Sequence, residues 1–145
     1  MSFEIILIAS LVIFLNIMDS GTTALCFRQY PDKELKGEAN PIMRRLMLKS
    51  RVGAEAVKHS FILGFTIYCV ISHDIVTLKW FVILLGLVVI NNSSILLARY
   101  ISKRKITSPI SKLCNLLHAP HSFGYLVALN IMIGIAFLIT RFIWI

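Results

Sequence analysis

The sequence is dominated by four apolar runs, each close to the ~20 residues that an α-helix needs to cross a bilayer. They cover residues 2–28, 52–73, 78–100 and 122–143. Lipid offers no hydrogen-bond partner to a backbone amide, so apolar runs of this length are typical of transmembrane helices. We therefore predict an all-α fold, with four transmembrane helices forming a single polytopic membrane domain over residues 1–145.

The composition agrees with this class. Only 15% of the residues are charged and 57% are hydrophobic, which is too apolar for a soluble domain of 145 residues. The start, Met1 to Glu4, lacks the positive residues of a signal peptide, so we expect the first run to be retained. The cysteines, Cys26, Cys69 and Cys114, are odd in number and irregularly spaced, which predicts neither a disulfide framework nor a cysteine metal site.

Charge placement predicts the topology. The net charge is +8, and basic residues gather in the first and third loops, whereas the second loop has Lys79 against Asp74. The positive-inside rule then puts loops one and three in the cytoplasm and both termini outside the cell membrane. No aromatic residues are interleaved with these charges, so nucleic acid is not an expected partner. The residues expected to contact anionic lipid are Arg44, Arg45, Lys49, Lys103, Arg104 and Lys105.

These charges leave two readings open. They either set the orientation and hold anionic lipid, or they form a site for a phosphate or lipid headgroup.

The first apolar run contains a charged residue, Asp19. A charge near the centre of a membrane helix costs roughly 2.5–3.5 kcal/mol on insertion scales, so it marks a functional or paired position. Asn16, Asp19, Ser20 and Thr23 fall on one side of a helix, at steps of three and four, and Thr22 lies beside them. We expect this polar stripe to face protein or water in the cytoplasmic half of the membrane.

The second helix supplies the expected partners of the stripe. Glu55, Lys58 and His59 lie one helical turn apart near its start, and Lys58 is the predicted partner of Asp19. The third helix adds polar residues in its inner half. The complete predicted polar cluster comprises Asn16, Asp19, Thr22, Thr23, Glu38, Asn40, Glu55, Lys58, His59, Asn91 and Asn92.

The second helix also carries small residues at steps of four, Ala56, Ser60 and Gly64. Small residues at this spacing let helix backbones approach closely in lipid. The stripe therefore predicts that this face of the helix packs tightly against another helix.

The first loop predicts a short interfacial helix. Asn40 is a good N-cap, Pro41 suits the first helical position, and the residues after Pro41 alternate apolar and basic at helical spacing. Gly37 allows a bend before Glu38. Two roles stay open for Glu38 and Asn40: they fold back toward Asp19 and Thr22, or they serve only as local caps.

These residues carry a resemblance. Asp19 with Thr22, the segment Gly37-Glu38-Ala39-Asn40-Pro41 and Lys58 resemble a family of small prokaryotic membrane proteins, the domain of unknown function numbered 5658. The similarity covers residues 13–92, so the fourth helix looks like an addition. The resemblance implies a membrane protein and no particular activity.

Known catalytic patterns fit poorly. Cys114 with His118 and His121 is a weak metal set, because Pro120 breaks the helical spacing. Asp19 with Glu38 provides fewer carboxylates than magnesium-dependent lipid enzymes use. In the sequence, Ser20, Ser60 and Ser93 lack an adjacent candidate base that would make any one a clear nucleophile. We therefore predict no metal and no cofactor, and we favour a protein that is not an enzyme.

Three classes of function are compatible with the sequence. The favoured one is a non-catalytic membrane subunit or scaffold, associated with other membrane subunits or with copies of itself. The second is a small transporter or ion-conducting homo-oligomer. The sequence shows no internal inverted repeat, which counts against this class. The third is a protein or enzyme that binds lipid headgroups at the cytoplasmic leaflet.

Overall fold

A computed structural model describes residues 2–29, 40–102 and 121–143 of the chain. Every regular element in these ranges is an α-helix, which confirms the predicted all-α class. The helices are α1 (Phe3–Gln29), α2 (Pro41–Lys49), α3 (Arg51–Ile71), α4 (Ile75–Ser102) and α6 (His121–Ile143). Among the described residues, α1, α3 and α4 are long and apolar enough to cross a membrane, whereas the described apolar part of α6 is the shorter stretch Asn130–Phe142.

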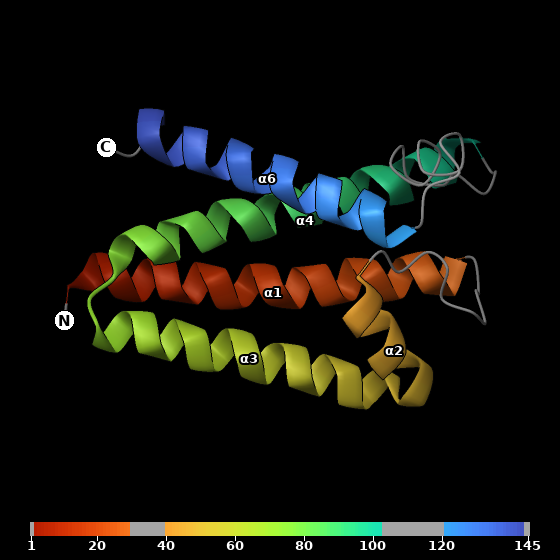
Figure 1. The fold of residues 1–145 in the computed structure, drawn as a ribbon, viewed down its shortest axis with the longest axis horizontal. Helices are drawn as coiled ribbons and strands as arrows, with labels where there is room; N and C mark the ends of the chain where they lie inside the picture. Colours follow the sequence, from red (N-terminus) through yellow and green to blue (C-terminus); the bar gives the residue numbers. More distant parts are fainter. Residues whose placement is uncertain (1, 30–39, 103–120, 144–145) are drawn as a thin grey trace.

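The long helices lie side by side, with α1 between α3 and α4 and with α6 packed on α4 (Figure 1). The helices α1 and α4 run in one direction, and α3 and α6 run in the other. The end of α1, the start of α3 and the end of α4 therefore share one end of the bundle. We call it the basic end, because these helix ends and α2 carry Arg28, Arg44, Arg45, Lys49, Arg51 and Arg99.

The apolar core lies toward the opposite end. Ile5, Ile8 and Val12 of α1 pack against Cys69 of α3 and Leu78 of α4. These side chains are at most 8% exposed, and phenylalanines and aliphatic residues of α3 and α4 surround them. The first helix thus has an apolar half that makes the core and a polar half that faces the basic end.

The turn between α3 and α4 explains why α4 begins at Ile75, three residues before the predicted start. His73 has a left-handed backbone (φ 56°), and the amides of His73 and Asp74 bond the carbonyls of Val70 and Cys69. This is a Schellman ending for α3. The Asp74 carboxylate then accepts the Thr77 amide (3.0 Å) and hydroxyl (2.5 Å), so it caps α4.

The short helix predicted after Asn40 is present as α2. The Asn40 Oδ1 atom accepts the amides of Ile42 (3.0 Å) and Met43 (3.3 Å), and Pro41 occupies the first turn. Met47 packs on Ala54 of α3, together with Phe27, Met43 and Leu46. The helix therefore lies across the ends of α1 and α3, at the basic end.

No described helix of the same chain packs against the small-residue stripe on α3. Ala56, Ser60 and Gly64 are all exposed, and a Cβ atom added at Gly64 would meet nothing within 4 Å. Its close packing against another helix therefore stays a prediction. The stripe is uncovered because α3 turns its polar residues and Ile62, Phe65 and Cys69 inward, which rotates the small residues outward.

Candidate functional site

Asp19 and Lys58 form the centre of a polar network between α1 and α3. The Lys58 Nζ atom lies 3.2 Å from Oδ2 of Asp19, so the pair predicted from the sequence is present. The two side chains are only 18% and 15% exposed. At this degree of burial an unpaired charge would be costly, and the pair offsets that cost for both helices.

Glu55 extends the network along α3. Its Oε2 atom lies 3.1 Å from the Lys58 ammonium and 3.7 Å from Nε2 of His59. The hydroxyl of Ser20 on α1 donates to the same carboxylate oxygen at 2.6 Å. Lys58 therefore stands between two carboxylates, one from each helix.

His59 links the network to a deeper part of α1. Its Nδ1 atom lies 2.7 Å from Nδ2 of Asn16, and its Nε2 atom lies 3.3 Å from the Ser20 oxygen. Asn16 is 4% exposed, and its Oδ1 atom has no hydrogen-bond partner among the described residues. Ser20 thus touches both Glu55 and His59, a bridging role that the helical spacing of the stripe did not predict.

The third helix of the network is α4, which contributes Asn92. Its amide nitrogen donates to Oδ1 of Asp19 (3.0 Å) and to the hydroxyl oxygens of Thr23 (3.2 Å) and Thr22 (3.5 Å). Asn91, which the sequence ranked equally, donates to Asn92 at 3.4 Å and supports it from one position away. The Asp19 carboxylate is therefore held from both neighbouring helices.

The network as a whole joins α1, α3 and α4 through charged and amide groups. It contains two carboxylates and one ammonium, so its formal charge is −1 while His59 is neutral. A net charge in a partly buried cluster is unfavourable unless solvent or a further positive charge compensates it. Nearer the basic end, Arg99 of α4 donates to the Cys26 carbonyl at 3.2 Å, a contact between α1 and α4 that the sequence did not suggest.

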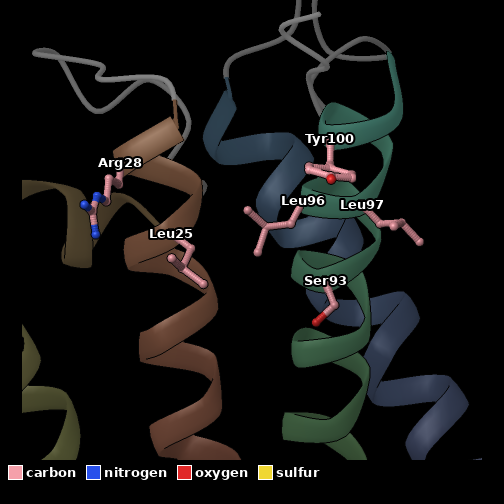
Figure 2. A pocket seen from close by; sticks show the side chains of 6 residues that line it. All are labelled: Leu25, Arg28, Ser93, Leu96, Leu97 and Tyr100. Carbon is pink, nitrogen blue, oxygen red and sulfur yellow. The ribbon is translucent and has the colours of Figure 1, made fainter. Parts of the chain in front are cut away.

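A groove of about 570 Å³ lies between α1 and α4 at the basic end. It is lined by Leu25 and Arg28 of α1 and by Ser93, Leu96, Leu97 and Tyr100 of α4. Figure 2 shows Leu25 and Leu96 pointing into the gap between the two helices. The groove walls are mainly apolar, and Tyr100 lies near the outer end, whereas the Arg28 side chain points away from the gap (Figure 2).

The remaining predicted residues divide into two groups. Asn40 caps α2, so of the two predicted roles the local cap is the one present. Of the predicted lipid contacts on α2, Arg44 is half-buried, and Arg45 and Lys49 are exposed. The other predicted positions, Glu38, Lys103, Arg104 and Lys105, lie outside the described residues, as do Cys114 and His118. In the described ranges, no group of three or more His, Cys, Asp or Glu side chains is arranged to hold a metal.

No family model, curated protein or solved structure matches this chain. The resemblance to the domain of unknown function numbered 5658 therefore stays a prediction. The function has to be argued from the site itself.

Proposed function

We propose that this protein is a non-catalytic integral membrane subunit, whose polar network fixes the arrangement of its own helices. The observation that carries the proposal is that side chains of the same bundle bind both carboxylate oxygens of Asp19 and one carboxylate oxygen of Glu55. Asp19 is bonded by Lys58 and Asn92, and Glu55 by Lys58 and Ser20. A catalytic or ion-binding carboxylate needs a ligand position that substrate or ion can take, whereas both oxygens of Asp19 are occupied by side chains of α3 and α4.

We propose that the bundle crosses the membrane four times, with both termini outside and the basic end in the cytoplasm. The common location of Arg28, Arg51 and Arg99 at one end supports this orientation. The helix α2, which lies across the bundle there, would rest at the cytoplasmic surface. Fusion of a reporter after Ile145 tests the topology, and a reporter that behaves as cytoplasmic contradicts it.

The outward stripe on α3 supports a role as a subunit. Ala56, Ser60 and Gly64 leave a shallow face without large side chains, and no described helix of the same chain covers it. In lipid, helices associate through close packing at such faces. We propose that a transmembrane helix of another subunit, or of a second copy, packs here.

The test is purification in mild detergent followed by identification of what remains bound. The proposal expects a stoichiometric membrane partner or a defined homo-oligomer. A homo-oligomer or monomer that carries ions or solutes across liposome membranes would overturn it and favour the transport class.

The groove between α1 and α4 favours a second candidate function, binding of an anionic lipid. Its apolar walls suit an acyl chain, and the positive charge gathered at this end of the bundle suits a phosphate headgroup. Replacing Leu96 by tryptophan fills the groove and should remove co-purifying phospholipid. The matched control is Leu63→Trp on α3, where the residue is exposed away from the groove. Equal phospholipid in both variants contradicts this candidate.

A further inference from the structure

The apolar side of α2 is turned toward its own bundle. Met47 packs on Ala54 of α3, and Met43, Leu46 and Phe27 of α1 close around that pair. The α2 members of this cluster stand at steps of three and four, so they form one side of the helix. An amphipathic helix that lies by itself on a membrane turns such a side to the lipid, whereas α2 uses it within the protein.

The opposite side of α2 combines aliphatic and basic side chains. Ile42 is 69% exposed and Leu48 is 56% exposed, and Arg45 and Lys49 are exposed as well. At about 100° per residue, these positions fall within about 120° of one another around the helix. Large apolar groups and cations therefore share one surface, and no described helix covers it.

The charge of this segment has a single sign. Residues 40–54 contain no acidic side chain, and their basic residues are Arg44, Arg45, Lys49 and Arg51. Cations favour an anionic partner, and exposed aliphatic side chains favour a partner with an apolar interior. The surface of an anionic bilayer offers both, with phosphates outside and acyl chains directly beneath them.

The contacts of α2 also place it at the level of lipid headgroups in a bundle that spans the membrane. Its Met47 belongs to a cluster with Phe27, two residues before the end of α1, and Ala54, three residues after the start of α3. Figure 1 shows α2 crossing the ends of these two helices. The 21 residues of α3 extend for about 32 Å, close to the ~30 Å of a hydrocarbon core, so the start of α3 lies at its boundary.

We propose that the outer side of α2, formed by Ile42, Arg45, Leu48 and Lys49, binds the anionic surface of the leaflet at the basic end. Ile42 and Leu48 enter the boundary between headgroups and acyl chains, and Arg45 and Lys49 contact lipid phosphates. This surface is separate from the groove between α1 and α4. The inference rests on the proposed placement of the bundle in a membrane and does not depend on a partner subunit.

The test introduces tryptophan at Leu48 in the full-length protein, which is reconstituted in nanodiscs of brominated phosphatidylcholine with or without phosphatidylglycerol. Bromine on the acyl chains quenches an indole that reaches them. Quenching of the unaltered protein, which contains Trp80 and Trp144, is measured in parallel and subtracted. We expect quenching of the introduced indole to be about twofold or more stronger with the anionic lipid, because the neighbouring cations are then drawn to the surface.

The decisive variant adds Arg45→Gln and Lys49→Gln to Leu48→Trp, and it should lose the preference for phosphatidylglycerol. The matched control adds Lys79→Gln instead, which removes a cation at the other end of the bundle, where Lys79 pairs with Glu4 at 3.1 Å. This control should keep the preference. Equal quenching in the two lipid mixtures, or equal behaviour of the two charge variants, overturns the proposal.

A second measurement uses the unaltered protein and applies if the variants do not fold. Amide hydrogen exchange over residues 42–49 should be slower in nanodiscs with phosphatidylglycerol than in phosphatidylcholine alone, and equal exchange contradicts the proposal. An indole that is quenched in neither lipid mixture also contradicts it and leaves the surface to a protein partner. Loss of the subunit role in the co-purification test would leave these results unchanged, so the two proposals fail separately.

Discussion

The Lys58 Nζ atom lies 3.2 Å from Oδ2 of Asp19, so two opposite charges that stand 39 positions apart in the sequence meet between α1 and α3. Neither helix would place a lone charge at this degree of burial without a large cost. Together the two residues fix how α1 and α3 are rotated and shifted relative to one another.

Removing one member of the Asp19–Lys58 pair should cost more than removing both. Asp19→Asn or Lys58→Met strands a partly buried charge, and we expect a loss of about 2–4 kcal/mol in the free energy of unfolding. The double variant should lose less than the sum of the two, which is measured by reversible unfolding in mixed micelles. Additive losses would show that the two charges do not interact.

The pair formed by Glu4 and Lys79 is the control for that cycle. Its separation is similar, 3.1 Å, but Glu4 is 58% exposed. Because solvent screens exposed charges, the corresponding variants should change stability by less than about 1 kcal/mol.

Asn92 should matter more than its neighbour Asn91. Asn92→Leu removes the donor to the Asp19 carboxylate and to Thr23, and hydrogen bonds to charged groups contribute about 1.5–3 kcal/mol. Asn91→Leu removes one weaker amide contact at 3.4 Å. Thermal unfolding of the two variants should therefore show a clearly lower midpoint for Asn92→Leu. Equal midpoints would contradict the assigned role of α4 in the network.

The cap of α4 should make stability depend on acid pH. The hydrogen bond from the Thr77 hydroxyl, followed by that from the Thr77 amide, lowers the pKa of Asp74 from its usual value. A carboxyl group with a lowered folded pKa stabilises the fold fully above the unfolded pKa, about 3.9, and loses that contribution as pH falls through the folded pKa.

Asp74→Ala should then reduce stability by about 1 kcal/mol at pH 7 and by progressively less below about pH 4. Circular dichroism melts between pH 7 and pH 3 measure the difference. Asp74→Asn keeps a capping oxygen and has no charge, so its loss at pH 7 should be smaller, and it should also decline at low pH as Asp74 of the unaltered protein becomes protonated. A pH-independent effect of Asp74→Ala would contradict the assignment of the cap.

His73 is a position where glycine should be preferred. Its left-handed backbone, φ 56°, costs a residue with a Cβ atom about 1–2 kcal/mol, whereas glycine adopts it freely. Glycine also has more entropy in the unfolded chain, which offsets part of this gain, so we expect His73→Gly to stabilise the fold by a net amount of up to about 1 kcal/mol. His73→Ala is the control, since it changes the side chain and keeps the backbone cost. Equal unfolding free energies for the two variants would contradict it.

The stripe on α3 is tested by a bulky substitution. Gly64→Ile meets nothing within 4 Å in its own chain, so it should leave the unfolding of the monomer unchanged. It should weaken association with a partner helix by about tenfold or more, measured by co-purification or by sedimentation in detergent. Gly134→Ile on α6 is the matched control, because this glycine is also exposed and unobstructed. Loss of association in both variants, or in neither, would exclude the α3 face.

The sequence by itself determined the helical class, the short helix after Asn40 and the pairing of Asp19 with Lys58. Long apolar runs have to bond their own backbone groups, and a capping Asn before a proline starts a helix locally. A charge on one such helix has few possible partners other than an opposite charge on a neighbouring helix. The helices and the cap depend on residues that are neighbours along one helix. The ion pair depends on the large cost of leaving a charge unpaired in a membrane helix.

Only the tertiary structure decided which face of each helix turned inward. Helical spacing puts Ala56, Ser60 and Gly64 on one face, but the Lys58 pair and the packing of Cys69 rotate that face outward. Asn91 and Asn92 differ by about 100° around α4, so the rotation of that helix alone selects Asn92. Ser20 becomes a bridge because Glu55 and His59 both arrive beside it. Such choices depend on the joint packing of three helices, and no local pattern contains that information.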